Sequence, residues 1–395
     1  MGRPTRLPRP TRAAVISGCG VVSPLGMGLR TFWEGLLAGR SAVEPIAGFP
    51  ADDLVPRAAA EVRDVPRTDP DRAGAFALEA VAQALADAAL EPASVDPRRL
   101  GVALGTTLGG MQLFERWLDG DPTEGLAQIP YYAPAVRVAR RLGCRGPVAT
   151  PQLACASGTH AIALATDWVR SERADVVLAG GADLLCRFVV AGFNSLRATA
   201  EEARPFDATR RGLVLGEGSA VVVVEDAAHA ARRRARVRGR VLGVGAAADA
   251  THMTAPDREG RGAARAIEAA LADADVAPAR VGFVSAHGTG TPFNDAMEAV
   301  AITRVFGPRN VPVNSIKGAI GHTLGAAGAF EAVLCLQVLA EGLIPPTVGL
   351  ATVDPACAGL DLVYGEPRRH PAETAVSTSS GFAGVNAALV LGRVG

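Results

Sequence analysis

The sequence predicts an α/β protein, because three features of the 395-residue chain agree. Apolar runs of strand length alternate with Ala-rich segments whose apolar residues recur at helical spacing. The strand candidates are apolar without alternation, which is typical of sheets covered by helices on both faces. Hydrophobic residues make up 49% of the chain, so a large buried core is expected and disorder is excluded.

The predicted elements follow one another along the chain. Residues 14–16 and 21–22 predict two short strands on either side of a Gly turn. Further apolar runs predict strands at residues 101–104, 176–179, 221–225, 241–244, 283–286, 311–314 and 387–391. Apolar residues at helical spacing predict helices at residues 76–88, 158–170, 262–273 and 326–341.

The chain is expected to consist of two weakly similar halves. Each half has an early Gly-bearing strand, a Gly/Ala-rich turn that opens a long helix, and a late strand in which Gly precedes an apolar run. We place the boundary near residue 236. This divides the chain into a basic N-terminal tail (1–12), an N-terminal half (13–236) and a C-terminal half (237–395).

The most charged stretch, residues 228–240, lies at this boundary. We expect a solvated helix that leads into the crossover between the halves, with a nucleic-acid patch as the alternative. The stretch lacks interleaved aromatic residues and the chain has no net charge, and both observations favour the helix.

Composition excludes several function classes. A formal net charge of zero gives no electrostatic reason for binding nucleic acid or a membrane surface. The six cysteines are scattered without a C-x-x-C pair and no secretory leader is visible, so neither a disulfide framework nor a metal site is expected. We find no apolar, uncharged run of about 18 residues. A cytoplasmic protein is therefore predicted.

Lys317 is the only lysine among the 40 basic residues. A single lysine kept where every other basic residue is arginine indicates a position that requires a compact ammonium and not a planar guanidinium. The alternative is that one lysine survived by chance a general bias toward arginine.

The first candidate site is Cys155, in the stretch Ala-Cys-Ala-Ser-Gly at residues 154–158. It follows an apolar run and opens a predicted helix, so a strand, a tight turn and a helix are expected. A cysteine at a helix N-terminus experiences a field that favours the thiolate. The alternative is a small buried hydrophobic residue.

Two histidines also follow predicted strands. His287 opens the Gly-rich loop His-Gly-Thr-Gly-Thr, and His322 lies five residues beyond Lys317 in a second Gly-rich loop. Ligands bind at such strand ends in α/β sheets. A nearby lysine would lower the pKa of His322 and keep it neutral at pH 7. The alternatives are core histidines that cap turns, or a phosphate-binding loop at residues 287–291.

Residues 379–386, Ser-Ser-Gly-Phe-Ala-Gly-Val-Asn, predict a flexible loop before the last strand. Its N–H groups could bind an oxyanion, and the alternative is an ordinary connecting loop.

Taken together, Cys155, His287 and His322 form a Cys-His-His set. Acylation of a sulfur followed by decarboxylation to a carbanion needs this set, because two neutral histidines can stabilise an enolate by hydrogen bonds. A cysteine protease needs only one base.

The chain resembles the β-ketoacyl-acyl-carrier-protein synthases, the elongating condensing enzymes of fatty acid and polyketide synthesis. The order and spacing of nine stretches carry this resemblance over nearly the whole chain beyond residue 12. They are VISGCGVVSPLG, GVALGTTLGG, ACASGTHAIALA, ADVVLAGGAD, RPFDATRRGLVLGEGSAVVVVED, HMTAP, AHGTGTPFNDAMEA, SIKGAIGHTLGAAGAFEAV and GFAGVNAAL.

The resemblance implies a thiolase-like five-layered αβαβα fold made of two duplicated halves. It also implies a homodimer or a pseudo-symmetric heterodimer with a related synthase or chain-length factor. Substrates would arrive on the phosphopantetheine arm of an acyl carrier protein, so no bound cofactor and no metal are expected.

The resemblance also implies a role for each matching residue. Cys155 would accept the acyl group, and His287 and His322 would drive decarboxylation of malonyl-carrier protein and stabilise the enolate. Lys317 would tune His322, and Glu331 would organise this network.

Further roles concern the substrate. The N–H groups of Cys155 and Phe382 would form an oxyanion hole, and the Phe382 ring would gate the acyl pocket. Other matching positions would contact the pantetheine arm (Thr289 and Thr291), the acyl channel (Leu108 and Phe193) and the acidic carrier protein (Arg67, Arg72 and Arg197).

One position departs from the family pattern. The last loop of the family usually reads Gly-Phe-Gly-Gly, whereas this chain has Ala383 at the third position. A methyl group there is costly if the residue needs a positive φ, so we expect an effect on acyl specificity.

Three other functions are weighed against decarboxylative condensation. A chain-length-factor-like partner subunit has usually lost its cysteine, and a thiolase would carry a second catalytic cysteine in the terminal loop. This chain keeps Cys155 and has no cysteine after Cys357. A thioester hydrolase would release free acid without forming a carbon–carbon bond.

Overall fold

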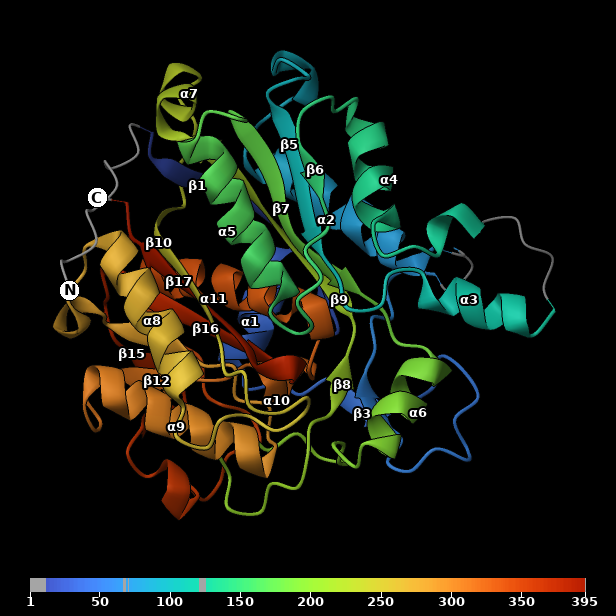
Figure 1. Ribbon diagram of the computed structural model, residues 1–395, viewed down its shortest axis with the longest axis vertical. Helices are drawn as coiled ribbons and strands as arrows, with labels where there is room; N and C mark the ends of the chain where they lie inside the picture. Colours follow the sequence, from blue (N-terminus) through green and yellow to red (C-terminus); the bar gives the residue numbers. More distant parts are fainter. Residues whose placement is uncertain (1–11, 67–68, 70, 121–125, 395) are drawn as a thin grey trace.

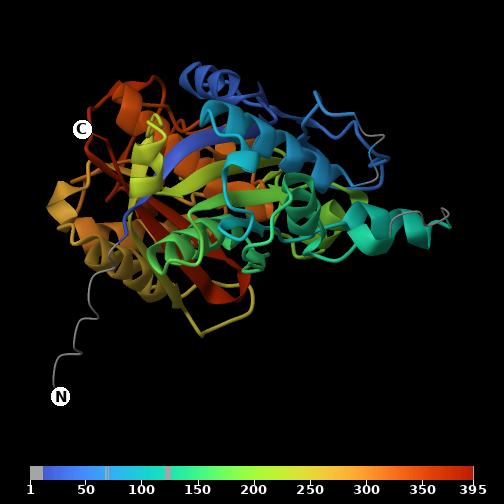
Figure 2. The same ribbon diagram turned by 90° about the horizontal axis from the view of Figure 1, so that it is seen from above.

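The computed structural model of the protein describes residues 12–66, 69, 71–120 and 126–394. The predicted basic tail, apart from its last residue, lies outside these ranges. Sheets and helices stack as five layers in the order helix, sheet, helix, sheet, helix (Figures 1 and 2). The α/β class predicted from the apolar strand runs is confirmed.

The first sheet comes from the N-terminal part of the chain. Its strands lie in the order β1 (Ala14–Ser23), β9 (Gly218–Asp226), β7 (Val176–Asp183), β5 (Leu100–Gly105) and β6 (Val148–Ala149). The first three strands pair antiparallel and the last three pair parallel. Every residue of β5, β7 and β9 is buried, which explains why their sequences are apolar without alternation.

The second sheet repeats this pattern. Its strands lie in the order β10 (Gly239–Ala248), β17 (Val385–Gly392), β16 (Thr374–Gly381), β11 (Phe283–Ser285), β12 (Pro312–Asn314) and β14 (Asp361–Leu362). The first three pair antiparallel and the others parallel. A short antiparallel contact between β1 and β10 joins the two sheets. The common pairing order is the one expected of duplicated halves.

Two helices fill the space between the sheets. Helix α5 (Ser157–Arg170) packs on β5 and β7, and α11 (Ala327–Glu341) packs on β16 and β11. The two helices also contact each other near the centre of Figure 1.

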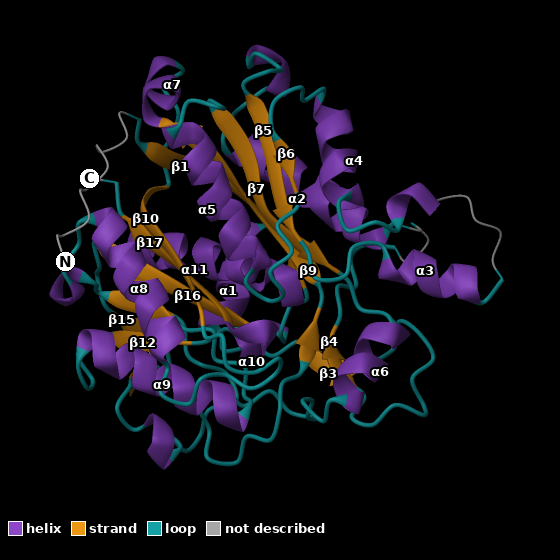
Figure 3. Cartoon of the chain, viewed as in Figure 1, coloured by secondary structure: helices purple, strands orange, loops and turns teal. Residues whose placement is uncertain are grey.

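The outer layers and the remaining elements complete the fold. Helices α2 (Arg72–Asp87) and α4 (Ala133–Leu142) cover the first sheet, and α8 (Arg261–Ala274) covers the second. The other helices and strands, coloured by type in Figure 3, are α1 (Leu29–Leu37), α3 (Met111–Leu118), α6 (Arg187–Ser195), α7 (Ala227–Arg232), α9 (Pro292–Phe306), α10 (Lys317–Ile320), β2 (Gly26–Met27), β3 (Val43–Pro45), β4 (Ala58–Ala60), β8 (Leu215–Gly216), β13 (Leu343–Ile344) and β15 (Arg368–Arg369).

Small residues let the two central helices begin close together. A Cβ added at Gly158 would lie 2.8 Å from the Gly325 carbonyl oxygen, and one at Gly328 would lie 1.9 Å from Thr159 Oγ1. Larger side chains at either glycine would separate the helices. The loops that precede α5 and α11 are therefore held side by side, and these loops carry the candidate site.

Helix α11 is the central core helix of the protein. The segment Leu324–Glu341 has a mean hydropathy of 1.5 and could cross a membrane by length and composition, but 89% of it is buried inside the protein. The segment contains Glu331 and ends at Glu341, so it does not contradict the expectation that the chain holds no apolar, uncharged run of about 18 residues. Its burial between two sheets explains its composition.

Three sequence expectations about elements are corrected. β1 is one continuous strand with a register irregularity between Ile16 and Gly18, not two strands around a turn. Strand β16 was missed because its Ser- and Thr-rich sequence lacks an apolar pattern, and it absorbs residues 379–381 of the predicted loop. The charged stretch at 228–240 is helical only as far as Arg232, and β10 begins at Gly239.

The prediction that Arg72 meets a carrier protein is also wrong. The Arg72 side chain is fully buried at the start of α2 and forms an ion pair with Glu217, 2.9 Å apart. It also donates to the Val65 carbonyl oxygen at 2.5 Å and to that of Val62. Arg72 therefore ties α2 to the loop before β9.

We predict that Arg72→Met lowers the free energy of unfolding by about 3–5 kcal/mol, because it breaks the buried ion pair between Arg72 and Glu217. The matched control is Arg63→Met, which removes an exposed ion pair with Glu44 and should cost less than about 1 kcal/mol. Chemical denaturation of the two variants measures both values. Equal losses in the two variants would contradict this assignment.

Candidate active site

Cys155 lies in a tight turn that ends one residue before α5. Ala154 adopts a left-handed conformation with φ of 49°, which turns the chain sharply before the cysteine. Ser157 closes the turn: its Oγ accepts from the Leu153 N–H at 2.9 Å and donates to the Ala154 carbonyl at 2.6 Å. The turn and helix predicted around Cys155 are present, whereas the strand before them is only the two residues of β6.

The Cys155 thiol is buried, with 6% of the residue exposed. Burial raises the pKa of Cys155 to about 12, although the Lys317 ammonium acts to lower it. The field expected at the helix N-terminus favours the thiolate, but desolvation outweighs the favourable charges. The resting group is a thiol.

His287 and His322 lie against each other. Their ring centroids are 5.2 Å apart and the rings meet edge to face at 86°. His287 follows β11, and its N–H donates to Glu298 Oε1 at 2.7 Å. His322 follows the short helix α10, and its N–H donates to the Val214 carbonyl at 2.7 Å.

Lys317 contacts His287 directly, and its charge also acts on His322, which the resemblance implied it would tune. Its Nζ lies 3.3 Å from His287 Nδ1 and donates to the His287 carbonyl oxygen. It also forms a buried ion pair with Glu331 on α11. Glu331 accepts in turn from Ser379 Oγ at 3.2 Å. Lys317 thus links a loop, the central helix and strand β16.

Both histidines are held neutral. Burial lowers the pKa of His287 and of His322 well below the ordinary value, and the charge of Lys317 acts in the same direction on both. Burial raises the pKa of Glu331 while Lys317 opposes this rise. An ammonium can only donate, so His287 Nδ1 is the acceptor nitrogen and the proton lies on Nε2.

One cavity of about 360 Å³ brings Cys155, His287 and His322 together. Its wall includes Phe193 and Phe382, whose rings stack with centroids 5.9 Å apart. Its other lining residues are Leu196, Arg197, Ala198, Arg211, Leu213, Asp249, Thr254, Ala255, Pro256, Thr289, Thr291, Pro292, Phe293, Asn294, Met297, Ser380, Gly381, Gly384 and Asn386.

The loop that carries Phe382 is packed against the cysteine turn. A Cβ added at Gly381 would lie 3.2 Å from the Cys155 nitrogen. Ala383 adopts a left-handed conformation with φ of 66°, and its N–H donates to the Met253 carbonyl at 2.7 Å. Ala383 therefore adopts a conformation that strains an alanine but not a glycine, as expected if this position requires a positive φ.

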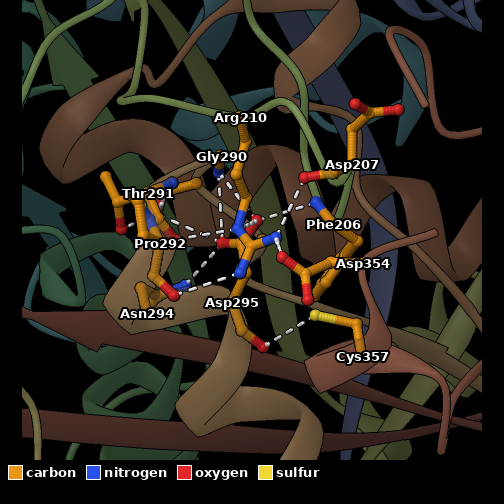
Figure 4. A network of polar contacts seen from close by, with 12 residues as sticks. Phe206, Asp207, Arg210, Gly290, Thr291, Pro292, Asn294, Asp295, Asp354 and Cys357 are labelled. Atoms are coloured by element: carbon orange, nitrogen blue, oxygen red, sulfur yellow. Dashed lines mark hydrogen bonds and ion pairs between the residues drawn. The ribbon is translucent and has the colours of Figure 1, made fainter. Parts of the chain in front are cut away.

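Thr289 and Thr291 line the same cavity, and their hydroxyl oxygens are 2.9 Å apart. Their loop is fixed by Asp295, which accepts from the Gly290 N–H at 3.1 Å and from the Phe206 N–H at 2.7 Å (Figure 4). Burial raises the pKa of Asp295 to about 6, whereas the Phe206 N–H and Arg210 act to lower it.

Arg210 holds this loop from the other side and was not predicted from the sequence. It donates to the Thr291 carbonyl at 3.4 Å and the Pro292 carbonyl at 3.2 Å, and it pairs with Asp354 at 2.5 Å (Figure 4). The only signal for Arg210 in the sequence is its place in the stretch RPFDATRRG, which shows no charge pattern that distinguishes it from a surface arginine.

The remaining predicted residues are placed differently. Leu108 is not among the residues that line this cavity; it packs against the core of the first half, and its N–H donates to Asp183 at 3.1 Å. Arg197 is exposed and lines the cavity. Arg67 lies outside the described residues. Within the described part of the chain, no group of His, Cys, Asp and Glu residues has the arrangement of a metal site.

A buried cysteine that shares a cavity with two neutral histidines, in a five-layered α/β fold, defines an enzyme of the Cys-His-His type. Residues 11–230 match the family described as "Beta-ketoacyl synthase, N-terminal domain", and residues 238–351 match "Beta-ketoacyl synthase, C-terminal domain". The 3-oxoacyl-[acyl-carrier-protein] synthase 2 of Coxiella burnetii is 38% identical over 413 residues, which cover 97% of this chain and 99% of the relative.

Solved structures agree. "The ishigamide ketosynthase/chain length factor" matches with a TM-score of 0.91 and 37% identity, over 97% of this chain and 100% of that chain. A second structure, AntDE:AntF, is described as a type II PKS acyl-carrier protein in complex with its ketosynthase; it matches with a TM-score of 0.90 and 31% identity, again over 97% and 100%. The chain belongs to the β-ketoacyl synthase family and has its thiolase-like fold.

We predict that Lys317→Met raises the pKa of His287 and His322 toward the ordinary value of about 6.5, because it removes a buried positive charge beside two imidazoles. At pH 6 more of each histidine is then imidazolium. NMR titration of the histidine rings measures this shift, with Arg240→Met, which removes an exposed charge, as the control. Histidines that titrate alike in Lys317→Met and the wild type would contradict the role given to Lys317.

Proposed function

We propose that this protein is a β-ketoacyl-acyl-carrier-protein synthase that elongates an acyl chain by decarboxylative Claisen condensation. The observation that carries the proposal is the cavity shared by a cysteine thiol and two neutral histidines. The family membership and the names of the relatives support it. The product belongs to fatty acid or polyketide/polyene synthesis.

In the first half-reaction the acyl group moves to Cys155. The sulfur attacks the thioester carbonyl, the bond from that carbon to the pantetheine sulfur breaks, and the Cys155 proton passes to the departing thiolate. The N–H groups of Cys155 and Phe382 bind the oxyanion. Because the resting group is a buried thiol, the proton leaves as the new bond forms.

In the second half-reaction malonyl-carrier protein enters the emptied arm site. The bond to the malonyl carboxylate breaks and releases CO2, and its electron pair becomes an enolate. His287, with its proton on Nε2, and His322 donate hydrogen bonds to the enolate oxygen. The enolate carbon then attacks the Cys155 thioester, and the sulfur leaves as a thiolate that takes a proton from solvent.

Neutral histidines suit this reaction because they donate without becoming acids. An imidazolium would protonate the enolate before it attacked the thioester, whereas a neutral Nε2–H stabilises the charge and keeps its proton. The buried Lys317 maintains that state, and Glu331 balances the lysine charge in the core. Both are positioning residues in this proposal.

We also propose how the protein is organised and where it acts. Two halves, residues 13–236 and 237–395, pack around α5 and α11, and the chain pairs with a second copy or with a related chain-length factor. An acyl carrier protein supplies the phosphopantetheine arm, no cofactor is resident, and the reaction takes place in the cytoplasm. Arg67 and Arg197 meet the carrier, and Leu108 limits the length of the acyl channel.

A non-catalytic chain-length-factor-like subunit is the second candidate, since a structure similar to this chain is described as "The ishigamide ketosynthase/chain length factor". The described cavity argues for the catalytic reading, because Cys155, His287 and His322 are all present and close together. A subunit that never forms a thioester on Cys155 would support the second candidate.

We predict that Cys155→Ala abolishes acyl transfer to the protein, because no sulfur remains in the cavity. Intact-protein mass after incubation with acyl-carrier proteins measures this. Cys144→Ala is the matched control, since Cys144 is a half-buried cysteine away from the cavity lining and should leave the adduct unchanged. An adduct on Cys155→Ala of wild-type size and rate would sink the mechanism.

We predict that His322→Gln still accepts the acyl group but releases CO2 from malonyl-carrier protein at least about 100-fold more slowly, which is the scale of losing one oxyanion donor. The separation is expected because the imidazole stabilises the enolate and not the first thioester. Mass measurement follows acylation and trapped CO2 follows decarboxylation. Equal slowing of both steps would contradict the division of roles.

A further inference from the structure

Two arginines lie at the mouth of the cavity without a carboxylate partner among the described residues. Arg197 and Arg211 both line the cavity and both are exposed. Arginine is suited to phosphate and carboxylate groups because its guanidinium presents several donors in a planar fork. Two arginines without ion-pair partners at the mouth of a cavity indicate that the ligand carries an anionic group there.

The backbone holds these two arginines on neighbouring segments. The Leu213 N–H donates to the Ala198 carbonyl at 2.8 Å, and the Ala200 N–H donates back to the Leu213 carbonyl at 2.9 Å. A Cβ added at Gly212 would lie 2.7 Å from the Ala198 oxygen. Arg197 and Arg211 each directly precede a residue of this contact, so their Cα atoms lie on the same part of the rim.

The rim segment is also fixed against the threonine loop. A Cβ added at Gly290 would lie 3.1 Å from the Gly212 carbonyl oxygen. Gly212 directly follows Arg211, and Gly290 lies between Thr289 and Thr291, so the two backbone segments are neighbours. Its neighbour Arg210 is buried and anchored to Asp354 and to the Thr291 carbonyl (Figure 4). Arg211 therefore has a rigid base while its own side chain is in solvent.

Neither of two nearby carboxylates, Asp249 and Glu202, forms an ion pair with these arginines. Asp249 lines the cavity, but its two oxygens accept from Asn386 Nδ2 at 2.8 Å and from the Asp257 N–H at 3.0 Å. Glu202 pairs with Arg204 at 2.5 Å. Among the residues that line the cavity, two arginines thus face one carboxylate, which leaves an excess of positive charge in a chain whose net charge is zero.

Exposure increases from the bottom of the cavity to its mouth. Cys155 is 6% exposed and Thr289 is 7% exposed, Thr291 is half-buried, and Arg197 and Arg211 are exposed. A phosphopantetheine arm has the same order of parts: a thioester at one end, polar amides along it, and a phosphodiester at the end that remains in water.

We propose that Arg211, together with Arg197, binds the phosphodiester of the phosphopantetheine arm and so sets how deeply the thioester reaches toward Cys155. This inference rests on the proposed function, because it takes the acyl-pantetheine thioester as the substrate. The arginine fork donates to the phosphate oxygens, while Thr289 and Thr291 contact the arm below them.

The experiment compares two small donors, an acyl-pantetheine and the same acyl-phosphopantetheine, which differ only in the phosphate. Acylation of Cys155 is followed by intact-protein mass, and kcat/KM is obtained for each donor. The wild type should prefer the phosphorylated donor. Arg211→Gln should lose about tenfold in kcat/KM for that donor, the scale of one charge-assisted hydrogen bond, and should react with the unphosphorylated donor as the wild type does.

Two further variants sharpen the test. Arg211→Lys keeps the charge without the fork and should recover part of the preference, which a merely structural role would not predict. Arg240→Gln removes an exposed arginine at the opposite end of β10 and should behave as the wild type with both donors.

Three outcomes would overturn this inference. In one, Arg211→Gln and the wild type discriminate equally between the two donors. In another, Arg211→Gln slows only the complete acyl-carrier protein, so the arginine meets the protein surface of the carrier and not the phosphate. In the third, Arg211→Gln slows both small donors equally, so the variant disturbs the cavity. Failure of the proposed function itself is distinct: the wild type would then gain no acyl group from any donor.

Discussion

The site depends on one buried charge. Lys317 lies in the core and is only 3% exposed. Its ammonium contacts Nδ1 and the carbonyl oxygen of His287 and forms an ion pair with Glu331. A buried ammonium is tolerable only with such partners. Burial lowers the pKa of both histidines and the same charge lowers it further, so the cost of burying the ammonium is tied to the chemistry of the cavity.

The fold makes this arrangement possible through close contact of its two central helices. Cys155 precedes α5 and His322 lies shortly before α11, so the contact of Gly158 with Gly325 brings the cysteine turn and the histidine loop together. Strand β16 closes the third side, because Ser379 bonds both Glu331 and Thr159. Residues far apart in the sequence thus form one hydrogen-bonded unit.

Local sequence predicted what depends on local structure. Most of the buried strands, the turn at Cys155 and the position of His287 after a strand were identified, because apolar runs and Gly-rich loops mark them directly. His322 was expected to follow a strand but follows the short helix α10. Long-range properties were not accessible. Nothing in the sequence around Arg72 distinguishes a buried ion pair from a surface contact, and the spacing of Lys317 suggested His322 as its partner although His287 lies closer in space. The burial that keeps Cys155 a thiol also depends on residues distant in the sequence.

The central claim is that this cavity forms a carbon–carbon bond. The most direct measurement supplies an acyl-carrier protein and malonyl-carrier protein labelled with ¹³C at the malonyl methylene carbon, and then determines the mass of the carrier-bound product. The account predicts a labelled β-ketoacyl chain that is two carbons longer than the donor, with one CO2 released per product. Free unlabelled acid, with no labelled ketoacyl chain, would contradict the account and identify a thioester hydrolase.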